Sequence, residues 1–506
     1  MNTATLLEKQ ARDLPDKTAI VHNDESITFK ALDELINRLA HYFQRRGIVQ
    51  GSKVLLFIRP SIELPAATFA LFKIGAVPVF IDPGMGRKNL LRAVKEVAPI
   101  AMIAPSSVQM LARVFRPSFS SVAIKLDCAK ILEASQKEES SFETYDAPED
   151  EMAAILFTSG ATGKPKGVVY THKIFITQTA LLQQMYGLTS NDVDCPCFPL
   201  FSFFTLAMGL TSFIPPIDPS KPSEIDPSAV VATIQNNNVT FAAGSPAIWM
   251  KVADYCIAHD IELPSLKSLV MFGAPVALSM HEKWQKVLPN GTTYTPYGAT
   301  ESLPISNISG NYILEHTSDA TCKGAGVCVG PVVPPLEARI YNDDEIIVSG
   351  PVVTTEYYNE AEATRASKLS LDGALWHKVG DVGTIDEQGR IWFWGRNSHV
   401  VDLEDRKMYP IPCELVFNQL DGIKRTALVG PIIDEKVVPT LVIEMEDGST
   451  RMTDELLGAL QDTRNRFEHT LPIELFYLKR SFPVDVRHNI KIDRLALRRW
   501  VEDKAI

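Results

Sequence analysis

Short apolar runs alternate with segments of helical periodicity along the first two thirds of the chain. Lys53–Ile58 ("KVLLFI") is strand-like, Leu64–Ala76 has apolar residues at helical spacing, and Val77–Asp82 ("VPVFID") returns to a strand. The runs "IAMIA" and "VAIKL" continue the series. This order predicts helices layered on buried, partly parallel sheets. We therefore expect an α/β fold.

The chain is too long for a single core. It has 506 residues, of which 45% are hydrophobic, so at least two domains are expected. From about residue 330, "EARIY", "EIIVSG" and "GTIDEQGRIWFWGR" predict a β-rich subdomain of short strands and turns. A charged segment with two prolines follows Arg396 and indicates a boundary. Beyond it, "TALVG", "PTLVIEM" and a helix near Asp454–Phe467 predict a small α+β domain.

Charge and cysteine usage limit the classes of partner and compartment. The formal net charge is −11 and no basic stripe is visible, so a nucleic-acid partner is not expected. Seven scattered cysteines without paired metal-ligand spacing favour a reduced, cytoplasmic setting. The most apolar windows are Leu64–Pro83, which Lys73 interrupts, and Phe201–Ile217, which Pro215 and Pro216 break. No membrane span is expected.

The segment "FTSGATGKPKG" (Phe157–Gly167) has the composition of a phosphate-binding loop. Its glycines allow close approach of the backbone, its amides can form an anion-binding nest, and its hydroxyls and lysines add donors and charge. It differs from the nucleoside-triphosphatase P-loop, because two residues instead of four separate Gly160 from Gly163 and Pro165 follows Lys164. Since "GVVYTH" predicts a strand, the loop is expected to join two strands. A hairpin tip rich in turn residues is the alternative.

Four further motifs add groups that suit a nucleotide. Glu301, in "TPYGATES", is a candidate Mg²⁺ ligand, and Tyr297 is a candidate for stacking on a base. Asp381, in "WHKVGDVG", can accept hydrogen bonds from ribose hydroxyls. Arg396, in "WGRNSH", and Lys491, in "DVRHNIKIDR", supply cations. Each has an ordinary structural alternative, such as a helix-start carboxylate or a surface ion pair, but together the motifs favour a nucleotide site.

The order of these motifs resembles the adenylate-forming enzymes: the acyl-CoA synthetases, luciferases and peptide-synthetase adenylation domains. The resemblance extends over essentially the whole chain. It implies a large N-terminal domain at 1–396, a hinge at 397–398 and a swinging C-terminal domain at 399–506. Ser398 stands where the family's hinge residue is commonly Asp or Lys.

The resemblance also implies roles for individual residues, with ATP and Mg²⁺ as cofactors. Lys491 would bridge the carboxylate and the α-phosphate. Thr300 and Glu301 would make the phosphate and Mg²⁺ contacts, and Thr158 would join Glu301 as a metal ligand. Asp381 and Arg396 would bind the ribose. The remaining ATP-binding positions are Thr158, Ser159, Gly160, Ala161, Thr162, Gly163, Lys166, Gly273, Ala274, Pro275, Tyr297, Gly298 and Ala299.

Several departures from the CoA-using members indicate one branch of the family. The segment "GRNSHVVDLEDRKMYPIPCELVF" lacks the glycine that lets pantetheine pass, and "PLFS" carries Ser202 where the family has His. With "VPVFIDPGMGRKNLL" and "VDVRHNIKIDRLAL", these features resemble the β-lactone synthetases of long-chain olefin biosynthesis, the OleC-type enzymes. That resemblance implies adenylation of a 2-alkyl-3-hydroxy fatty acid and attack by its own 3-hydroxyl, with possible assembly alongside other olefin-pathway enzymes.

An apolar pocket is expected for the acyl chain. Its candidate residues come from "CFPLFSFFTLAMG" and "FAAGSPAIW", with core packing as the alternative: Phe201, Phe203, Met208, Ala243 and Gly244. For the base that takes the hydroxyl proton, His172, His399 and the leaving phosphate stay open, and a satisfied structural imidazole is the alternative for each histidine.

Two other functions compete with lactone formation. One is a fatty-acid CoA ligase, or an acyl-AMP ligase that passes its product to a carrier thiol. The other is a non-catalytic acyl- or nucleotide-binding homologue, against which the retention of Lys491, Glu301 and Asp381 argues.

Overall fold

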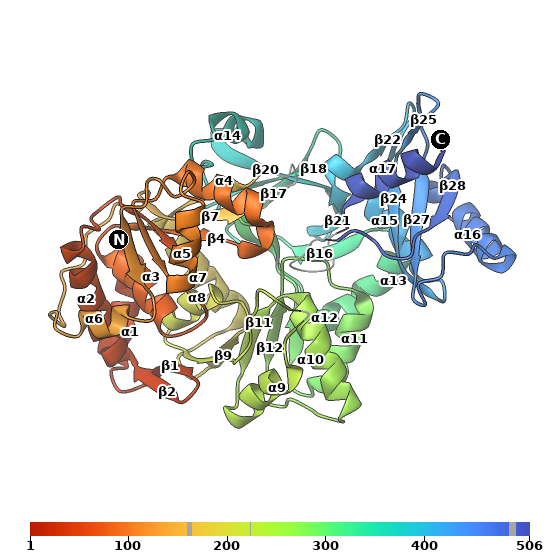
Figure 1. Ribbon diagram of the computed structural model, residues 1–506. Helices are drawn as coiled ribbons and strands as arrows, with labels where there is room; N and C mark the ends of the chain where they lie inside the picture. The colour runs from red at the N-terminus through yellow and green to blue at the C-terminus, as the bar shows by residue number, and fades with distance from the viewer. Residues whose placement is uncertain (159–163, 223, 485–491, 506) are drawn as a thin grey trace.

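Two sheets carry the first three hundred residues, and helices fill the space between them and cover their outer faces (Figure 1). The computed structural model describes residues 1–158, 164–222, 224–484 and 492–505. The first sheet is parallel except for its last pair, and its strand order is β6 (Ile124–Asp127), β5 (Ala101–Ala104), β3 (Lys53–Leu56), β4 (Val77–Ile81), β7 (Met152–Thr158) and β8 (Lys166–Thr171).

The second sheet has seven strands and is also parallel except at one edge. Its order is β13 (Thr292–Tyr294), β12 (Ser268–Met271), β11 (Phe241–Gly244), β9 (Val193–Pro196), β10 (Thr211–Ile214), β1 (Thr18–His22) and β2 (Glu25–Thr28). Strands β5, β11 and β12 are buried at every residue, as expected for parallel strands that are covered on both faces.

The helices that lie between the two sheets pack in the largest core: α1 (Ala4–Asp13), α2 (Phe29–Arg45), α3 (Glu63–Lys73), α7 (His172–Tyr186) and α8 (Phe201–Ala207). The outer face of the first sheet is covered by α4 (Arg87–Val97) and α5 (Ser106–Val114). The outer face of the second is covered by α9 (Pro227–Asn236), α10 (Pro246–Ala258) and α11 (Leu278–Val287). Shorter helical segments are η1 (Pro83–Met85), α6 (Ile131–Ser135), α12 (Gly310–Tyr312), η2 (Ile313–Thr317) and α13 (Ser318–Cys322).

Local sequence explains where the central helices begin and end. The hydroxyl of Thr28 caps α2 by accepting from the Ala31 amide, and Thr171 caps α7 by accepting from the Ile174 amide. Helix α7 ends at Gly187, whose φ of 62° is the left-handed conformation that glycine adopts without strain. The capping residues thus set the length of the helices between the sheets.

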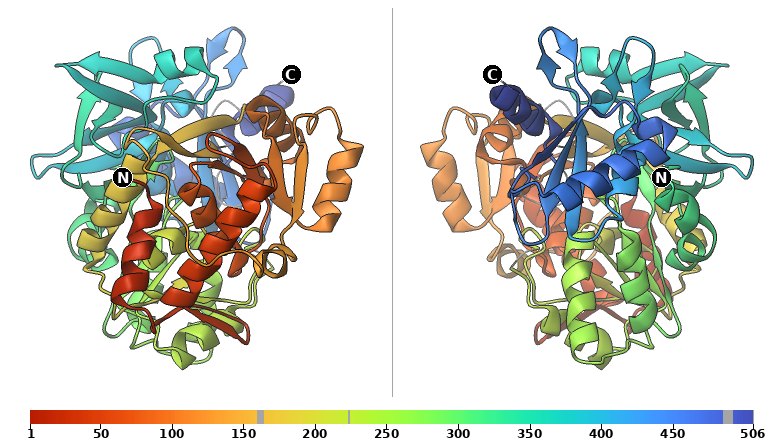
Figure 2. Two further views of the ribbon diagram at one scale, coloured as in Figure 1. Left: turned by 90° about the vertical axis from the view of Figure 1, so that its left-hand side faces the viewer. Right: turned by 90° about the vertical axis from the view of Figure 1, so that its right-hand side faces the viewer.

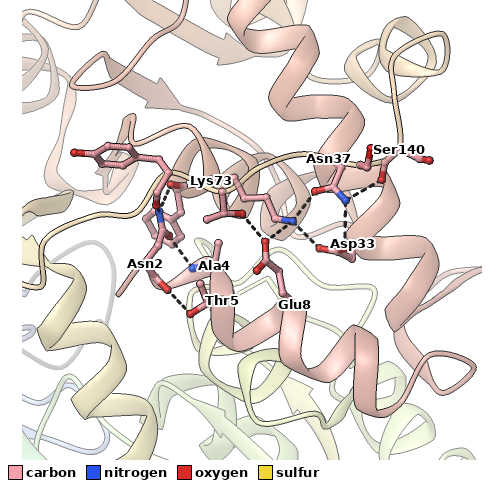
Figure 3. A network of polar contacts seen from close by, with 12 residues as sticks. Asn2, Ala4, Thr5, Glu8, Asp33, Asn37, Lys73 and Ser140 are labelled. Atoms are coloured by element: carbon pink, nitrogen blue, oxygen red, sulfur yellow. Dashed lines mark hydrogen bonds and ion pairs between the residues drawn. The ribbon is translucent and has the colours of Figure 1, made fainter.

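A buried ion cluster fixes the N-terminal helix to this core (Figure 3). The Lys73 ammonium, at the end of α3, lies 2.8 Å from Glu8 Oε1 and 2.8 Å from Asp33 Oδ1, and it donates to Asn37 Oδ1 at 2.5 Å. Asn37 also donates to the carbonyl of Ser140. Three helices therefore share one cation that is 2% exposed, and Asn37 extends the network to the loop before β7.

The third sheet is antiparallel and forms the β-rich subdomain. Its order is β16 (Val327–Pro331), β21 (Arg390–Arg396), β20 (Ala374–Ile385), β18 (Glu345–Ser349) and β17 (Glu337–Tyr341), with β19 (Lys368–Leu371) also paired to β20. A short pair, β14 (Tyr297–Ala299) and β15 (Ser302–Ser306), packs against its core, and α14 (Ala361–Ser367) precedes β19.

After β21 the chain passes through η3 (Asn397–His399) into a separate C-terminal core. In the right-hand view of Figure 2 these elements (blue) lie in front of the N-terminal part. They comprise β22 (Val401–Asp402), β23 (Lys407–Met408), α15 (Pro410–Phe417), β24 (Ile423–Val429), β25 (Ile432–Ile433), β26 (Lys436–Val437), β27 (Thr440–Met445), α16 (Asp454–Arg466), η4 (Glu468–Thr470), β28 (Leu475–Leu478) and α17 (Arg494–Ala505).

A buried carboxylate beside the third sheet contacts the C-terminal part. Asp344, 4% exposed, accepts the Lys407 ammonium at 2.8 Å and the Tyr409 hydroxyl at 3.0 Å. The Tyr409 ring lies 4.7 Å from that of Trp394. These contacts join the segment after η3 to both β21 and the β17–β18 turn.

The α/β prediction is confirmed, as are the β-rich subdomain and the small α+β tail. The division at 396–398 stays a prediction, although the chain does leave the third sheet at Arg396. Among the helices that the structure describes, none combines the length and apolar composition needed to cross a bilayer.

Candidate active site

The glycine-rich segment lies between β7 and β8, as the sequence predicted. These strands are antiparallel, with Thr158 opposite Lys166. Five of its predicted ATP-binding residues lie outside the described residues, as does Lys491: Ser159, Gly160, Ala161, Thr162 and Gly163. Of Thr158, the structure describes the backbone position at the end of β7.

The two lysines that flank this segment have different surroundings. Lys164 forms an ion pair with Glu360, just before α14. The Lys166 ammonium lies 4.9 Å from the centre of the Tyr357 ring and has no carboxylate partner among the described residues. Lys166 is therefore the cation that stays available to an anion beside the loop.

Glu301 is held by a tyrosine that the sequence did not single out. The Tyr357 hydroxyl donates to Glu301 Oε1 at 2.6 Å, and the described residues place no donor on Oε2. Burial, followed by the charge of Glu301, raises the pKa of Tyr357, so the phenol stays protonated and donates. The Tyr170 hydroxyl donates to the carbonyl of Thr300 at 2.7 Å, which fixes the turn between β14 and β15.

Tyr297, Asp381 and Arg396 meet in one cluster, although the chain separates them widely. The Tyr297 hydroxyl donates to Asp381 Oδ2 at 2.6 Å, and the Arg396 guanidinium lies 2.9 Å from Asp381 Oδ1. Asp381 on β20 is opposite Arg396 on β21, which explains their contact. Asp381 first, and then Tyr297 and Glu301, raise the pKa of Arg396 against the lowering effect of burial, so the guanidinium stays charged beside Asp381.

The other predicted nucleotide residues lie in turns. Gly273, with a φ of 91°, Ala274 and Pro275 follow the end of β12, and the two outer residues are exposed. A Cβ on Gly298 would lie 2.5 Å from the Ser302 carbonyl oxygen, so the β14–β15 pair requires glycine there. Ala299 packs against the core of the third sheet.

The candidate acyl residues divide between two cores. Phe201 stacks on Phe241 and Phe272, at ring distances of 5.7 and 5.8 Å, in a cluster that also contains Met208 and Ala243. Phe203 instead packs between the sheets, in the main core.

The difference between the two phenylalanines is geometric, because residues two apart on a helix point in nearly opposite directions. Gly244 is closely packed, since an added Cβ would lie 2.9 Å from that of Cys197. Ser202, where the family has His, donates to the carbonyl of Pro199.

The two candidate histidines lie in different environments. His172 is 2% exposed and its Nδ1 lies 3.0 Å from the amide of Thr3, so it is a core imidazole. Burial lowers its pKa to about 4. His399 is half-buried in η3, and burial, then Arg494 and Arg396, lower its pKa to about 4. Of the two, His399 is the one beside the Asp381–Arg396 cluster.

Sequence reasoning missed four residues around Glu301 and Thr300: Tyr170, Tyr357, Lys368 and His377. They come from β8, the segment before α14, β19 and β20. The paired tyrosines in "TTEYYNE" were a visible signal, whereas nothing in the local pattern distinguished Lys368.

A layered α/β body, a β-rich subdomain and a carboxylate–tyrosine–arginine cluster are the arrangement expected of a nucleotide-binding enzyme. A profile of the AMP-binding enzyme family matches residues 7–358, so the chain belongs to this family. The family predicted from the motif order is therefore confirmed.

Two curated relatives extend the similarity over the full chain. An olefin beta-lactone synthetase of Xanthomonas campestris pv. campestris is 35% identical over 100% of this chain and 98% of its own length. One of Stenotrophomonas maltophilia is 36% identical over 99% and 98%. Among solved structures, the O-succinylbenzoate coenzyme A synthetase MenE of Bacillus subtilis, in complex with ATP and magnesium ion, superposes with a TM-score of 0.79 at 21% identity, covering 97% of this chain and 99% of MenE.

Proposed function

We propose that this chain adenylates a 2-alkyl-3-hydroxy fatty acid with ATP and closes the product to a β-lactone, releasing AMP and pyrophosphate. The observation that carries the proposal is the near full-length similarity to two olefin beta-lactone synthetases, at 35% and 36% identity. The resemblance in the motifs and the absence of any glycine from residue 397 to residue 421 support it.

The nucleotide would lie across the edge where the first and third sheets meet. Asp381 would accept from the ribose hydroxyls, and the Tyr297–Arg396 pair would hold that carboxylate in place. Residues 273–275 and Tyr297 would border the adenine. The glycine segment and Lys166 would bind the β- and γ-phosphates, and Lys491 would bridge the carboxylate and the α-phosphate.

Glu301 fits the role of a magnesium ligand. One carboxylate oxygen is fixed by Tyr357, and the described residues leave the other one without a donor. Mg²⁺ commonly takes one or two protein carboxylates and completes its shell with phosphate oxygens and water. When bound, the ion would neutralise phosphate charge during adenylation.

Adenylation would join a carboxylate oxygen to the α-phosphorus and break the bond to the pyrophosphate oxygen. In the second step, the 3-hydroxyl oxygen would bond to the carbonyl carbon, the hydroxyl proton would leave, and AMP would depart with the electron pair. Because the nucleophile is tethered, positioning the substrate supplies its effective concentration. His399 lies near this cluster, but with a pKa of about 4 it is a weak base, so the leaving phosphate stays the alternative acceptor.

The wider assignments belong to the same proposal. The adenylation domain would comprise 1–396, the hinge 397–398 and the swinging domain 399–506. Seven free cysteines support a reduced, cytoplasmic setting. Assembly with other olefin-pathway enzymes is proposed from the resemblance.

The product identifies the reaction. Purified protein with ATP, Mg²⁺ and a 2-alkyl-3-hydroxy fatty acid should give a product lighter than the acid by one water, with no thiol consumed. A thioester formed on addition of CoA, with no lactone, would replace this proposal by that of a CoA ligase. Lys491→Ala should nearly abolish AMP formation while ATP still binds, and pyrophosphate release near the wild-type rate would remove Lys491 from its assigned role.

A further inference from the structure

Helix α5 carries an apolar face that no other described element covers. Met110, Leu111 and Val114 are 66%, 55% and 72% exposed. Met110 and Val114 are four residues apart and Leu111 lies beside both, so the three side chains share one face of the helix. Ala112, on the opposite side, is buried against the first sheet. Single exposed apolar side chains are ordinary, whereas neighbouring ones on one helix favour a binding surface.

Exposed cations accompany this face on α5 and on the neighbouring α4. The two helices meet where α5 ends and α4 begins, because the Arg87 guanidinium lies 5.8 Å from the centre of the Phe115 ring. Both helices cover the outer face of the first sheet, which forms one edge of the molecule in both views of Figure 2 (orange). The exposed cations of the two helices and of the turn after α5 are Arg87, Lys88, Arg92, Lys95, Arg113 and Arg116. The α4–α5 surface is defined here as these cations together with Met110, Leu111 and Val114.

The charge of the α4–α5 surface is opposite to that of the whole chain. Residues 87–125 contain seven basic residues and one acidic residue, whereas the formal net charge of the chain is −11. The acidic residue, Glu96, is partly buried near the end of α4. Asp127 lies at the start of α5, where it accepts from the Ser106 hydroxyl at 2.5 Å, at the opposite end of that helix from the two arginines. Within the described ranges, none of the six exposed cations forms an ion pair with a carboxylate.

We propose that the α4–α5 surface binds the surface of an anionic lipid bilayer. The apolar side chains of α5 would enter the headgroup region, and the cations beside them would contact lipid phosphates, as in helices that lie in a membrane interface. A bilayer is favoured because it supplies both anionic phosphates and an apolar interior at the depth of one side chain, whereas an acidic protein surface supplies only the charge.

This inference stands on the α4–α5 surface alone and goes beyond the proposed function. It also suits that function, since a fatty acid with two alkyl chains partitions into bilayers. An enzyme held at the bilayer surface would meet its substrate there.

Flotation of the full-length protein with vesicles, without ATP or acid, tests the proposal. The vesicles are phosphatidylcholine alone, or equal parts of phosphatidylcholine and phosphatidylglycerol. One variant combines Arg113→Gln and Arg116→Gln, and a second combines Met110→Ser and Val114→Ser. The matched control combines Ile257→Ser on α10 and Lys286→Gln on α11, because both residues are exposed on the helices that cover the second sheet.

The wild type should bind the anionic vesicles and not the neutral ones, and added salt should weaken the binding. Loss of the two arginines should weaken binding about 10- to 30-fold, because each basic residue near an anionic bilayer contributes about fivefold. Loss of the two apolar side chains should weaken it about tenfold. The control should bind like the wild type.

Four outcomes would overturn the proposal: no preference for anionic vesicles, wild-type binding by the arginine variant, wild-type binding by the serine variant, or an equal loss in the control. A wild type that does not float but sediments as a dimer, and as a monomer after Met110→Ser and Val114→Ser, would assign this surface to a second copy instead. If the wild type binds anionic vesicles but forms no lactone, the proposed function fails while the lipid-binding surface stands.

Discussion

Replacing Lys73 by methionine should destabilise the N-terminal part strongly, because it removes the only charge that compensates two carboxylates within the described cluster. Methionine keeps the length and apolar character of the stem. Glu8 and Asp33, each within 2.8 Å of the position of the ammonium, would then face one another, and Asn37 would lose its donor. Removing one member of a buried ion cluster costs about 3–5 kcal/mol.

The lower end of that range applies here. Glu8 and Asp33 are 20% and 22% exposed, so water screens part of their repulsion. At an effective dielectric constant of about 20 and a separation of about 5 Å, two like charges repel by roughly 3 kcal/mol. With an unfolding entropy of about 2.1 cal/mol/K per residue over roughly 400 residues, a loss of 3 kcal/mol lowers Tm by about 4 °C.

Urea titration and thermal melting followed by circular dichroism measure this change. Lys9→Met is the control, because Lys9 is exposed on the same helix as Glu8, and it should stay within about 0.5 kcal/mol of the wild type. Adding Asp33→Asn to Lys73→Met should recover part of the loss by removing one of the facing carboxylates. A loss below about 1 kcal/mol, or a double variant less stable than the single one, would refute the electrostatic reasoning.

Three other predictions concern buried carboxylates: Asp381, Asp344 and Asp194, the last of which is fully buried on β9 and accepts from the Thr205 hydroxyl at 2.7 Å. Asp381→Asn should raise the Kd for ATP about tenfold or more, because it removes the carboxylate held by Tyr297 and Arg396, and an unchanged Kd by calorimetry would contradict its ribose role. Burial raises the pKa of Asp194 to about 7, so its contribution to stability is present below about pH 4 and is lost as pH rises to 7. The difference in unfolding free energy between wild type and Asp194→Asn should therefore change by up to about 1.4 kcal/mol per pH unit across that window. A difference that stays constant with pH in urea titrations would disprove it. Lys407→Met leaves the buried Asp344 without its ammonium and should loosen the C-terminal part, seen as faster tryptic cleavage after Arg406, a site that both proteins retain, at an unchanged melting profile of the N-terminal part.

The C-terminal prediction connects stability with function. A C-terminal domain that swings must exchange the Asp344 contacts for others, whereas closing a lactone requires no second substrate to enter. If Lys407→Met leaves lactone formation unchanged while cleavage accelerates, docking through Asp344 is not required for ring closure.

The sequence by itself determined the order of elements and the motifs. Apolar runs and helical periodicity predicted β3, β4, β5, β6 and α3 of the first sheet, because burial on two faces makes a strand continuously apolar. The glycine segment was predicted between two strands, and β7 and β8 flank it. Tyr297, Asp381 and Arg396 were identified one by one from their motifs, and the structure brings them into a single cluster.

Tertiary structure decided which side chains face one another. Phe201 and Phe203 read alike in sequence, yet the helix directs one towards the Phe241 cluster and the other into the main core. His172 was a candidate base in the sequence, but in the fold its ring accepts a hydrogen bond from the Thr3 amide and is a buried structural imidazole. Tyr357, whose segment bridges to Val168 on β8, and Lys368, on a strand paired with β20, come to the Glu301 turn from two different sheets. Local sequence patterns predict how each segment folds, whereas contacts between segments far apart in the chain depend on how the sheets are assembled.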